Sequence, residues 1–332
     1  MPGAGLGDAV GLRVARTHAP RETSNILTGA PNTMSPQRVL IGKRNSAYQA
    51  LESLASNRQK RHKTRTFLVE GVQPINMALA NGWHFSGVVY ESDAVLSKWA
   101  QDVITQARAA DRYEVATQLF RGLSRKNEPS ELLGIVQMPN GGLERIPIKA
   151  DLLAIVVDRP RNPGNLGTLI RSCNAFGAHG VIVTGHGVDV YDPATITASR
   201  GSLFAVPVVR VESHEDVRQW AASVRGVHGT CRIVGTDETG SIDVSNYDLV
   251  WPTIVLLGNE MHGLSHAYRQ LCDVIVRIPM VGSATSLNVS VAGSIVLYDV
   301  LRQRRRPAGA VERLPDAATS TSEHAGGTRV ER

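Results

Sequence analysis

The stretch LAIVVDRPRNPGNLGTLIRSC, residues 153–173, decides the fold class of this chain. It opens at 153–158 with an apolar run that ends in aspartate, a pattern typical of a strand buried on both faces of a parallel sheet. Residues 159–165 are rich in Pro, Asn and Gly, which indicates a loop. The next residues have helical spacing, with one apolar stripe made of Leu166, Leu169, Ile170 and Cys173. A strand, a loop and a helix in this order predict an α/β unit.

The rest of the second half repeats this alternation. Apolar runs of strand length lie at 181–183, 206–211, 233–235, 253–257 and 274–278. The last helix has an apolar stripe, expected to pack on the sheet, that consists of Leu287, Val291, Ile295 and Tyr298. Helical segments separate most of the strands, so the pattern predicts a parallel sheet with helices on both faces.

The first half is predicted to be a smaller α/β domain. Short β-rich runs lie at 67–69, 87–90 and 134–136, with helical stretches at 72–80 and 96–109. The run Pro-Asn-Gly-Gly is the strongest break between the halves. We predict a flexible extension at 1–38 and a small domain at 39–138. A linker at 139–150 leads to a second domain at 151–306, and a disordered tail follows at 307–332.

The composition limits the class of protein. The chain has 332 residues, of which 42% are hydrophobic and 20% charged, as in a globular protein of two domains. Lys and Arg outnumber Asp and Glu by 36 to 30, which favours a polyanionic partner. No apolar run approaches the roughly 18 residues of a membrane-spanning helix and there is no signal peptide, so we expect a cytoplasmic protein without a membrane partner. The cysteines Cys173, Cys231 and Cys272 lie far apart, so we expect reduced thiols and no metal site.

Three polar loops follow strands of the predicted parallel sheet. They lie at 162–167, 258–263 and 278–288, and the first continues into Arg171. Ligands of such sheets gather beyond the carboxyl ends of the strands, so the loops together predict one binding site. Each loop alone also fits a turn or a helix cap, and Arg171 also fits a solvated helix position. The absence of a GxGxxG fingerprint and of a Walker loop argues against a dinucleotide site and an NTPase.

These loops resemble the three motifs of the SPOUT-superfamily (SpoU/TrmH-type) RNA ribose 2′-O-methyltransferases. The first is Asn-Pro-x-Asn-x-Gly-x3-Arg at 162–171, and the second is Leu-Gly-Asn-Glu-x2-Gly-Leu-Ser at 257–265. The third is Ile-Pro-Met-x-Gly-x3-Ser-Leu-Asn-Val-Ser at 278–290. All three occur in the order and at the spacing of the family.

The resemblance extends beyond the motifs. Arg44-Asn45 and Phe-Leu-Val-Glu-Gly at 67–71 are similar to the RNA-binding domain of the family, which has a ribosomal protein fold. Residues 190–193 and 201–204 are most similar to the branch that methylates 23S rRNA in antibiotic-producing actinomycetes and confers avilamycin resistance. The resemblance therefore implies an RNA partner for this chain.

The resemblance also implies a fold and a site. It implies a C-terminal SPOUT domain with a deep trefoil knot, in a homodimer whose active sites lie near the subunit interface. It implies S-adenosylmethionine as the cofactor, bound in a bent form. The residues that match cofactor-binding positions are Gly258, Asn259, Gly263, Ile278, Met280 and Leu287. The residues that match positions of catalysis or substrate placement are Asn165, Arg171, Glu260, Ser286 and Asn288.

The chemistry of methyl transfer constrains these roles. A ribose hydroxyl is a weak acid, so its attack on the methyl group needs a proton acceptor or stabilisation of the developing oxyanion, and no metal. Arginine is effectively never deprotonated in proteins, so Arg171 is not expected to be the base. We hypothesise that Arg171 orients the target phosphate or stabilises the alkoxide, while Glu260 or a phosphate oxygen takes the proton.

Basic residues of the small domain are candidates for RNA contact, because phosphate neutralisation dominates nucleic-acid affinity. They are Arg58, Lys60, Arg61, Lys63, Arg65, Arg125 and Lys126. A solvated helix face explains such runs as well. The arginines at 302 and 304–306 are expected to have a structural role at the end of the last helix.

The chain is therefore expected to be an S-adenosylmethionine-dependent RNA ribose 2′-O-methyltransferase that acts on 23S rRNA and can confer antibiotic resistance. Two alternatives stay open. One is a tRNA 2′-O-methyltransferase, and the other is an RNA-binding protein that has lost catalysis.

Overall fold

The computed structural model describes residues 37–305. The predicted tail at 307–332, Arg306 and nearly all of the predicted extension at 1–38 lie outside the described residues. Gln37 and Arg38, which the sequence assigned to that extension, belong to the first strand of the smaller sheet. This strand pairs with residues 111–115, so its backbone has a defined conformation.

The N-terminal part contains a five-stranded sheet. Its strands are β1 (Gln37–Ile41), β2 (Thr66–Glu70), β3 (Phe85–Glu91), β4 (Asp111–Val115) and β5 (Leu132–Gln137). Their order is β1-β4-β3-β5-β2, with β4 parallel to β1 and β3, and β5 antiparallel to β3 and β2. The helices are α1 (Ser46–Ser56), α2 (Arg58–Thr64), α3 (Val72–Ala80), α4 (Lys98–Ala107) and α5 (Thr117–Leu123). This part is an α/β domain, as predicted, although β1 and β4 were not expected.

The C-terminal part contains a seven-stranded sheet in which every pairing is parallel. Its strands are β6 (Leu153–Asp158), β7 (Gly180–Thr184), β8 (Val208–Val211), β9 (Arg232–Thr236), β10 (Ile242–Asp243), β11 (Thr253–Leu257) and β12 (Val274–Arg277). Their order is β10-β12-β9-β11-β6-β7-β8. The helices are α6 (Pro163–Ala175), α7 (Pro193–Ser199), α8 (His214–His228), α9 (His266–Leu271) and α10 (Val289–Arg304). The predicted parallel sheet is confirmed.

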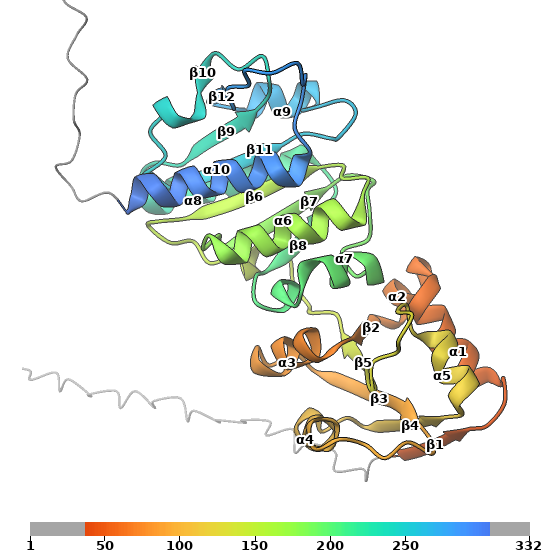
Figure 1. Cartoon of the computed structure of the whole chain (residues 1–332). Helices are drawn as coiled ribbons and strands as arrows, with labels where there is room; N and C mark the ends of the chain where they lie inside the picture. The colour runs from red at the N-terminus through yellow and green to blue at the C-terminus, as the bar shows by residue number, and fades with distance from the viewer. Residues whose placement is uncertain (1–36, 306–332) are drawn as a thin grey trace, which may run out of the picture. The chain divides into compact units, whose positions relative to one another are not determined.

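Helices cover both faces of this sheet. Along β6, Leu153, Ile155 and Val157 belong to the apolar cluster that includes α6 and α10. The alternate residues Ala154 and Val156 belong to the cluster that includes α8. Figure 1 shows α6 and α10 side by side over one face. Burial on both faces explains why the central strands are apolar throughout, which is the pattern that predicted a parallel sheet.

The last helix packs differently from the prediction. The stripe expected to face the sheet is 36% to 56% exposed and consists of Leu287, Val291, Ile295 and Tyr298. The buried residues of α10 are Ser290, Gly293, Val296, Leu297, Asp299 and Val300. A Cβ atom at Gly293 would lie 2.5 Å from Leu169 Cδ1 and 2.8 Å from Leu257 Cδ1, so glycine lets α10 approach α6 and β11 closely. The helix thus exposes an apolar stripe, which we call the α10 stripe.

Arg304 has a structural role near the end of α10. Its guanidinium donates hydrogen bonds of 2.6 to 3.1 Å to the backbone carbonyls of Asp151, Leu152, Leu249 and Trp251. These carbonyls precede β6 and β11, so Arg304 ties the last helix to the starts of two central strands. The role is structural, as expected, but it depends on neighbouring loops rather than on the charge of the helix end.

A buried ion pair joins the two domains. Arg61 in α2 lies 2.8 Å from Asp189, which precedes α7, and both side chains are at most 3% exposed. The imidazole Nε2 of His62 lies 3.0 Å from the other carboxylate oxygen of Asp189. A buried charge that loses its partner is strongly destabilising, so this cluster contributes to holding the domains together.

The cysteines are free thiols, as expected. Cys173 and Cys231 are buried and Cys272 is half-buried. Burial raises the pKa of Cys231 and of Cys272 to about 11, which keeps both thiols protonated at neutral pH. Residues 37–305 contain no group of three or more His, Cys, Asp or Glu placed to hold a metal ion. In the same range, no helix has the length and apolar character needed to span a bilayer.

Candidate active site

The three predicted loops meet at one edge of the parallel sheet. The strands β6, β11 and β12 all end there, and the strand order β12-β9-β11-β6 brings the loops together. They surround a cavity of about 670 Å³, within the range of about 300 to 1,000 Å³ that small-molecule sites occupy. The predicted residues that line it are Asn165, Gly258, Asn259, Glu260, Gly263, Ile278, Met280, Ser286, Leu287 and Asn288.

The second loop, 258–263, is held in a tight turn. Asn259 and Gly263 exchange two backbone hydrogen bonds of 2.9 Å. A Cβ atom at position 258 would overlap the backbone of Gly263, so only glycine fits there. The buried Asn259 side chain donates to Arg159 O at 2.7 Å and accepts from Met261 N at 2.9 Å. It thereby fastens the second loop to the first.

A chain of hydrogen bonds links the three loops beside the cavity. The Glu260 carboxylate accepts from Asn165 Nδ2 at 3.3 Å, and Asn165 Oδ1 accepts from Asn288 Nδ2 at 2.9 Å. Asn288 Oδ1 accepts from the backbone N–H and the hydroxyl of Ser290 at 2.9 and 2.7 Å. Each motif contributes one of the first three side chains, so the chain of bonds exists only when all three loops are in place. We call Glu260, Asn165 and Asn288 the rim network.

Glu260 also holds the start of α6. Its carboxylate accepts from Arg161 N at 3.1 Å and from Asn162 N at 3.3 Å. Asn162 is the N-cap of the helix, and its side chain accepts from Asn165 N at 3.1 Å. The helix dipole favours a carboxylate at this position. The capping role considered for the first loop is therefore real, and it coexists with the site.

In the third loop, residues 278–287 leave their backbone available to a ligand. None of their N–H or C=O groups takes part in a backbone hydrogen bond within residues 37–305. Ile278, Met280 and Leu287 give the cavity apolar surface beside these polar groups. Apolar walls with a few convergent hydrogen-bonding groups suit an adenosyl ligand. The residues present thus fit S-adenosylmethionine.

Sequence reasoning missed the wall that follows β9. Thr236, Asp237 and Glu238 line the cavity. Burial opposes the ionisation of Asp237, but hydrogen bonds from Thr239 and Arg269 outweigh burial and lower the pKa of Asp237. A signal for this wall was present, because a polar run directly follows the predicted strand at 233–235.

Arg171 does not line the cavity. It lies on the exposed face of α6, and its guanidinium has no hydrogen bond or ion pair with another residue of the part that the structure describes. Among the residues matched to catalysis, the structure brings Asn165, Glu260, Ser286 and Asn288 together and leaves Arg171 apart.

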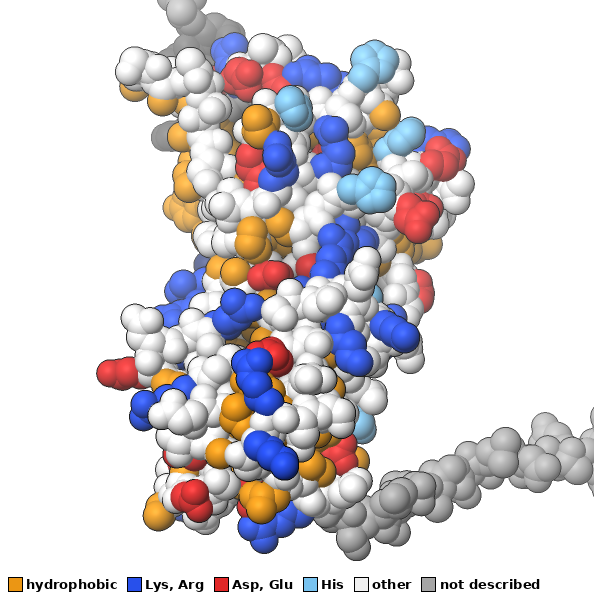
Figure 2. Space-filling view, turned by 90° about the vertical axis from the view of Figure 1, so that its right-hand side faces the viewer, with side chains coloured by type: hydrophobic (Ala, Val, Ile, Leu, Met, Phe, Trp, Pro, Cys, Tyr) orange, Lys and Arg blue, Asp and Glu red, His pale blue; other side chains and the backbone are white. Residues whose placement is uncertain are grey.

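The structure separates Arg61 from the other basic residues expected to bind RNA. Arg61 is 2% exposed and paired with Asp189, so the expectation that it contacts phosphates is corrected. Figure 2 shows one side of the molecule, with Lys and Arg side chains spread over both domains and fewer Asp and Glu between them. The predicted basic residues that reach the surface are Arg58, Lys60, Lys63, Arg65, Arg125 and Lys126.

The parallel sheet and the cavity at its carboxyl edge are those of a SPOUT methyltransferase. The profile of the SpoU rRNA Methylase family matches residues 152–298, and that of the SpoU L30e-like domain matches 45–134. The 23S rRNA (uridine(2479)-2′-O)-methyltransferase of Streptomyces viridochromogenes is 44% identical over 271 residues, which cover 81% of this chain and 94% of that protein. The chain therefore belongs to the SpoU family of rRNA methylases.

Solved structures agree with this assignment. The SpoU methyltransferase AviRb from Streptomyces viridochromogenes, in complex with AdoMet, superposes with a TM-score of 0.76 at 45% identity, covering 79% of this chain and 98% of that chain. An AdoMet-bound rRNA methyltransferase from Sinorhizobium meliloti superposes with a TM-score of 0.71 at 29% identity, covering 80% and 98%. Enzymes of this family use S-adenosylmethionine, which is the cofactor of this chain.

Proposed function

We propose that this protein transfers the methyl group of S-adenosylmethionine to a ribose 2′-hydroxyl of 23S rRNA. The observation that carries the proposal is the rim network, which joins all three motifs beside the cavity. The name of the Streptomyces relative, a 23S rRNA uridine 2′-O-methyltransferase, favours rRNA over tRNA. The complete rim network argues against an RNA-binding protein that has lost catalysis.

The reaction needs a sugar oxygen held in line with an activated methyl group. When bound, the cofactor supplies that methyl group on a sulfonium. Backbone groups at Gly258, Ile278 and Leu287 are the proposed partners that hold it. The amides of Asn165 and Asn288 fix each other, so their remaining polar groups can position the ribose or its phosphate. The Ser286 hydroxyl is exposed in the same cavity and is proposed to assist this placement.

The proton of the ribose hydroxyl must leave during the transfer. The Glu260 carboxylate already accepts hydrogen bonds from Arg161 N, Asn162 N and Asn165 Nδ2. Its first role is therefore to position the start of α6 and the Asn165 amide. Of the two acceptors considered, this arrangement favours a phosphate oxygen of the RNA over Glu260.

The proposal includes a homodimer formed through the α10 stripe. Leu287 belongs to this stripe and also lines the cavity, so a second copy that covers the stripe lies next to the site. Removing the stripe from water is worth roughly 25 cal/mol per Å² of apolar area. Arg171 on the adjacent helix does not line its own cavity, and we propose that it serves the partner's, where it binds the target phosphate.

Four further parts complete the proposal. The basic residues of the N-terminal domain that reach the surface bind RNA phosphates, with Arg58, Lys60, Lys63, Arg65, Arg125 and Lys126 as the candidates. The chain after Ile278 passes through an earlier loop as a deep trefoil knot. The enzyme works in the cytoplasm.

Its methylation protects the ribosome from an antibiotic. Growth of a host that expresses the enzyme, in the presence of ribosome-directed drugs, tests this part directly.

Methylation of separated ribosomal and transfer RNA with labelled S-adenosylmethionine tests the enzyme assignment. We expect label in 23S rRNA and, after mapping, on a single ribose 2′-oxygen. The variant Asn165→Ala/Asn288→Ala lacks two members of the rim network and should leave the same RNA unlabelled. Labelled tRNA with bare 23S rRNA would overturn the substrate, and failure to bind the cofactor in calorimetry would overturn the enzyme.

A further inference from the structure

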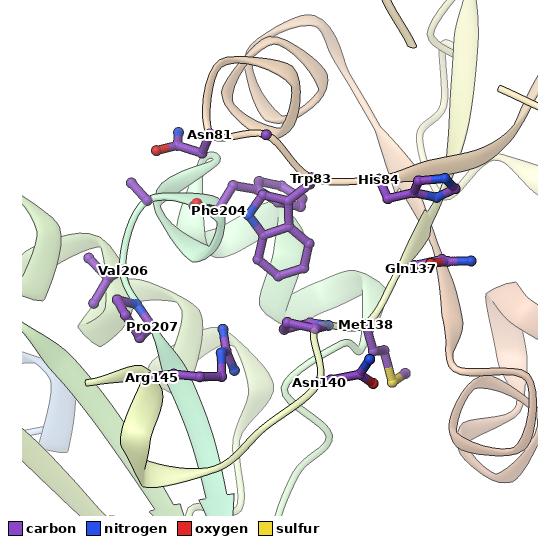
Figure 3. Close-up of a pocket in the computed structure, with 13 residues that line it drawn as sticks. Asn81, Trp83, His84, Gln137, Met138, Asn140, Arg145, Phe204, Val206 and Pro207 are labelled. Atoms are coloured by element: carbon purple, nitrogen blue, oxygen red, sulfur yellow. Dashed lines mark hydrogen bonds between the residues drawn. The ribbon is translucent and has the colours of Figure 1, made fainter. Parts of the chain in front are cut away.

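A second cavity, of about 500 Å³, lies where the two domains meet. Figure 3 shows that its walls come from three parts of the chain: residues 81–84, 137 and 138 of the N-terminal domain, Pro139, Asn140 and Arg145 of the linker, and residues 204–207 of the C-terminal domain. Residues 204–207 precede β8, and Arg145 donates to the carbonyl of Val208 at the start of β8. The cavity therefore lies at the amino edge of the parallel sheet.

The methyl-transfer cavity lies at the opposite edge. A strand of five residues rises about 3.3 Å per residue, so the two edges are roughly 17 Å apart. This distance is too great for the second cavity to hold the ribose that is methylated. Whatever it binds must be another ligand or another part of the substrate.

Trp83 forms a rigid wall of the second cavity. Its indole Nε1 donates to Phe204 O at 2.9 Å, and its ring packs edge-on against Phe204 with centroids 5.1 Å apart. A second edge-on contact, with Phe67 at 6.1 Å, holds the ring from the N-terminal domain. Figure 3 shows the Trp83 ring projecting into the space between Phe204 and Met138. A fixed, half-exposed aromatic ring is a platform on which a base can stack.

Polar groups surround this platform. The side chains of His84 and Gln137 are exposed and make no hydrogen bond to other residues between 37 and 305. The Asn140 side chain accepts from Arg65 Nη2 at 3.1 Å, which leaves its own N–H groups free. Arg145 uses Nη1 for the carbonyl of Val208 and also approaches the Tyr191 hydroxyl, which leaves part of its five N–H donors for a ligand. Amides and an imidazole suit the edge of a base, and a guanidinium suits a phosphate.

The charges around the cavity favour an anionic ligand. Its walls contain an arginine and no carboxylate. The contact between Asn140 and Arg65 connects the cavity to the proposed phosphate-binding surface, to which Arg65 belongs. An RNA strand that follows that surface would therefore arrive at this cavity.

We propose that the second cavity binds an unpaired nucleotide of the substrate RNA, with its base stacked on Trp83 and its phosphate at Arg145. This inference rests on the proposed function and adds to it a recognised nucleotide that is distinct from the methylated one. Such a nucleotide would contribute to the choice of RNA without touching the reacting atoms. A free mononucleotide offers the same chemistry, so the test has to separate the two sources.

The variant His84→Ala/Gln137→Ala tests the proposal, because neither side chain holds the fold together. The matched control is Thr105→Ala/Gln106→Ala, two exposed residues of α4 that do not line the cavity. We expect the cavity variant to raise KM for 23S rRNA about tenfold, the factor that corresponds to 1.4 kcal/mol. Its kcat and its Kd for S-adenosylmethionine should match those of the control, because the two cavities lie at opposite edges of the sheet.

Photo-crosslinking provides the readout that a merely structural role would not give. We expect 23S rRNA that carries 4-thiouridine to crosslink to peptides containing residues 81–84 or 137–140. If the cavity variant has an unchanged KM and no crosslinks form, the inference is overturned. The proposed function stays intact in that case as long as the wild-type protein methylates 23S rRNA. Binding of free uridine monophosphate to the cavity without any rRNA crosslink overturns it as well. If the wild-type protein neither binds the cofactor nor methylates RNA, the proposed function is contradicted instead.

Discussion

Asn165 is the residue at which the three motifs depend on one another most directly. Its side chain donates to Glu260 and at the same time accepts from Asn288. An amide offers a donor and an acceptor on one small planar group without a change of protonation state. Aspartate at this position would lose the donor and would place a second carboxylate beside Glu260, where like charges repel. The chemistry of a single side chain thus explains why the first motif has asparagine here.

Glu260→Gln should separate the positioning role of the carboxylate from its place in the cavity wall. In the wild-type protein, both carboxylate oxygens of Glu260 accept from N–H donors of Arg161, Asn162 and Asn165. The glutamine amide replaces one of these oxygens by an NH₂ group, which cannot accept, so the start of α6 and Asn165 should shift. A displacement of about 1 Å costs roughly 10²-fold in rate, and we expect a loss of this size in single-turnover methyl transfer.

Glu238→Gln is the matched control, because Glu238 lines the same cavity outside the rim network. It should retain most of the wild-type rate. Equal rates for the two variants would contradict the positioning role of Glu260. Cofactor affinity, measured by calorimetry, separates a loss of rate from a loss of binding.

At the scale of secondary structure, the last helix shows where sequence patterns stop being informative. It is apolar on two sides, so spacing alone cannot choose between the α10 stripe and the face that contains Val296 and Val300. The choice is made by Gly293, whose missing side chain permits close approach to α6 and β11. That contact depends on tertiary structure, and the sequence pattern therefore predicted the wrong face.

The strands of the two sheets differ in how readily they were recognised. The central strands β6, β7 and β11 of the parallel sheet are buried on both faces, so their continuous apolar runs were recognised. In contrast, β1 and β4 of the smaller sheet have no continuous apolar run, because Arg38 and Arg112 interrupt their apolar residues. Their pairing, rather than their composition, makes them strands.

The candidate site was predicted only in part. Motif resemblance found the loops, because their residue types and spacing are local features. The contribution of Asp237 and the hydrogen bonds of the rim network depend on the strand order β12-β9-β11-β6, which no local pattern encodes. Likewise, Arg61 lies in a run of basic residues that is typical of a protein surface, and only its position opposite Asp189 reveals that it is buried.

Val291→Glu tests the α10 stripe as the dimer interface. Val291 is 47% exposed, so a glutamate there should leave the folded subunit intact but place a charge in the proposed interface. We expect the variant to be monomeric in light scattering after size exclusion, and its methylation to fall because Arg171 no longer reaches a partner. Val227→Glu, at a valine 64% exposed on α8, should stay dimeric. A dimeric Val291→Glu protein would rule out this interface.

At the scale of the whole molecule, the buried pair of Arg61 and Asp189 makes domain docking sensitive to acid. Burial opposes ionisation of Asp189, but hydrogen bonds from Arg61 and His62 outweigh it and lower the pKa of Asp189 below its ordinary value of 3.8. A carboxylate whose pKa falls on folding stabilises the folded state above that ordinary value. Its contribution is lost as the pH falls through the lower pKa of the folded state.

Asp189→Asn should therefore destabilise the protein in a pH-dependent manner. At pH 7 it leaves Arg61 buried without a counter-charge, which costs about 3 to 5 kcal/mol in the free energy of unfolding. The difference from wild type should shrink as the pH is lowered below 3.8, because Asp189 of the unfolded wild-type chain then binds a proton, and the folded carboxylate becomes neutral at still lower pH. Urea unfolding across a pH series measures both quantities.

Asp192→Asn is the control for this series. Asp192 lies 3.6 Å from Arg61, but its side chain is 37% exposed, and asparagine can also cap α7. We expect a change below about 1 kcal/mol. A gap between Asp189→Asn and wild type that stays constant down to pH 2 would contradict the ionic origin of the effect.

The rim network also has a consequence for biosynthesis. Asn288 begins the last described helix, so a ribosome must translate most of the message before the site can form. A nascent chain that has not yet been synthesised as far as Asn288, or one released before this helix by a premature stop codon, lacks the third member of the rim network. Truncation anywhere before the last described helix is therefore expected to abolish the site even when both sheets are complete.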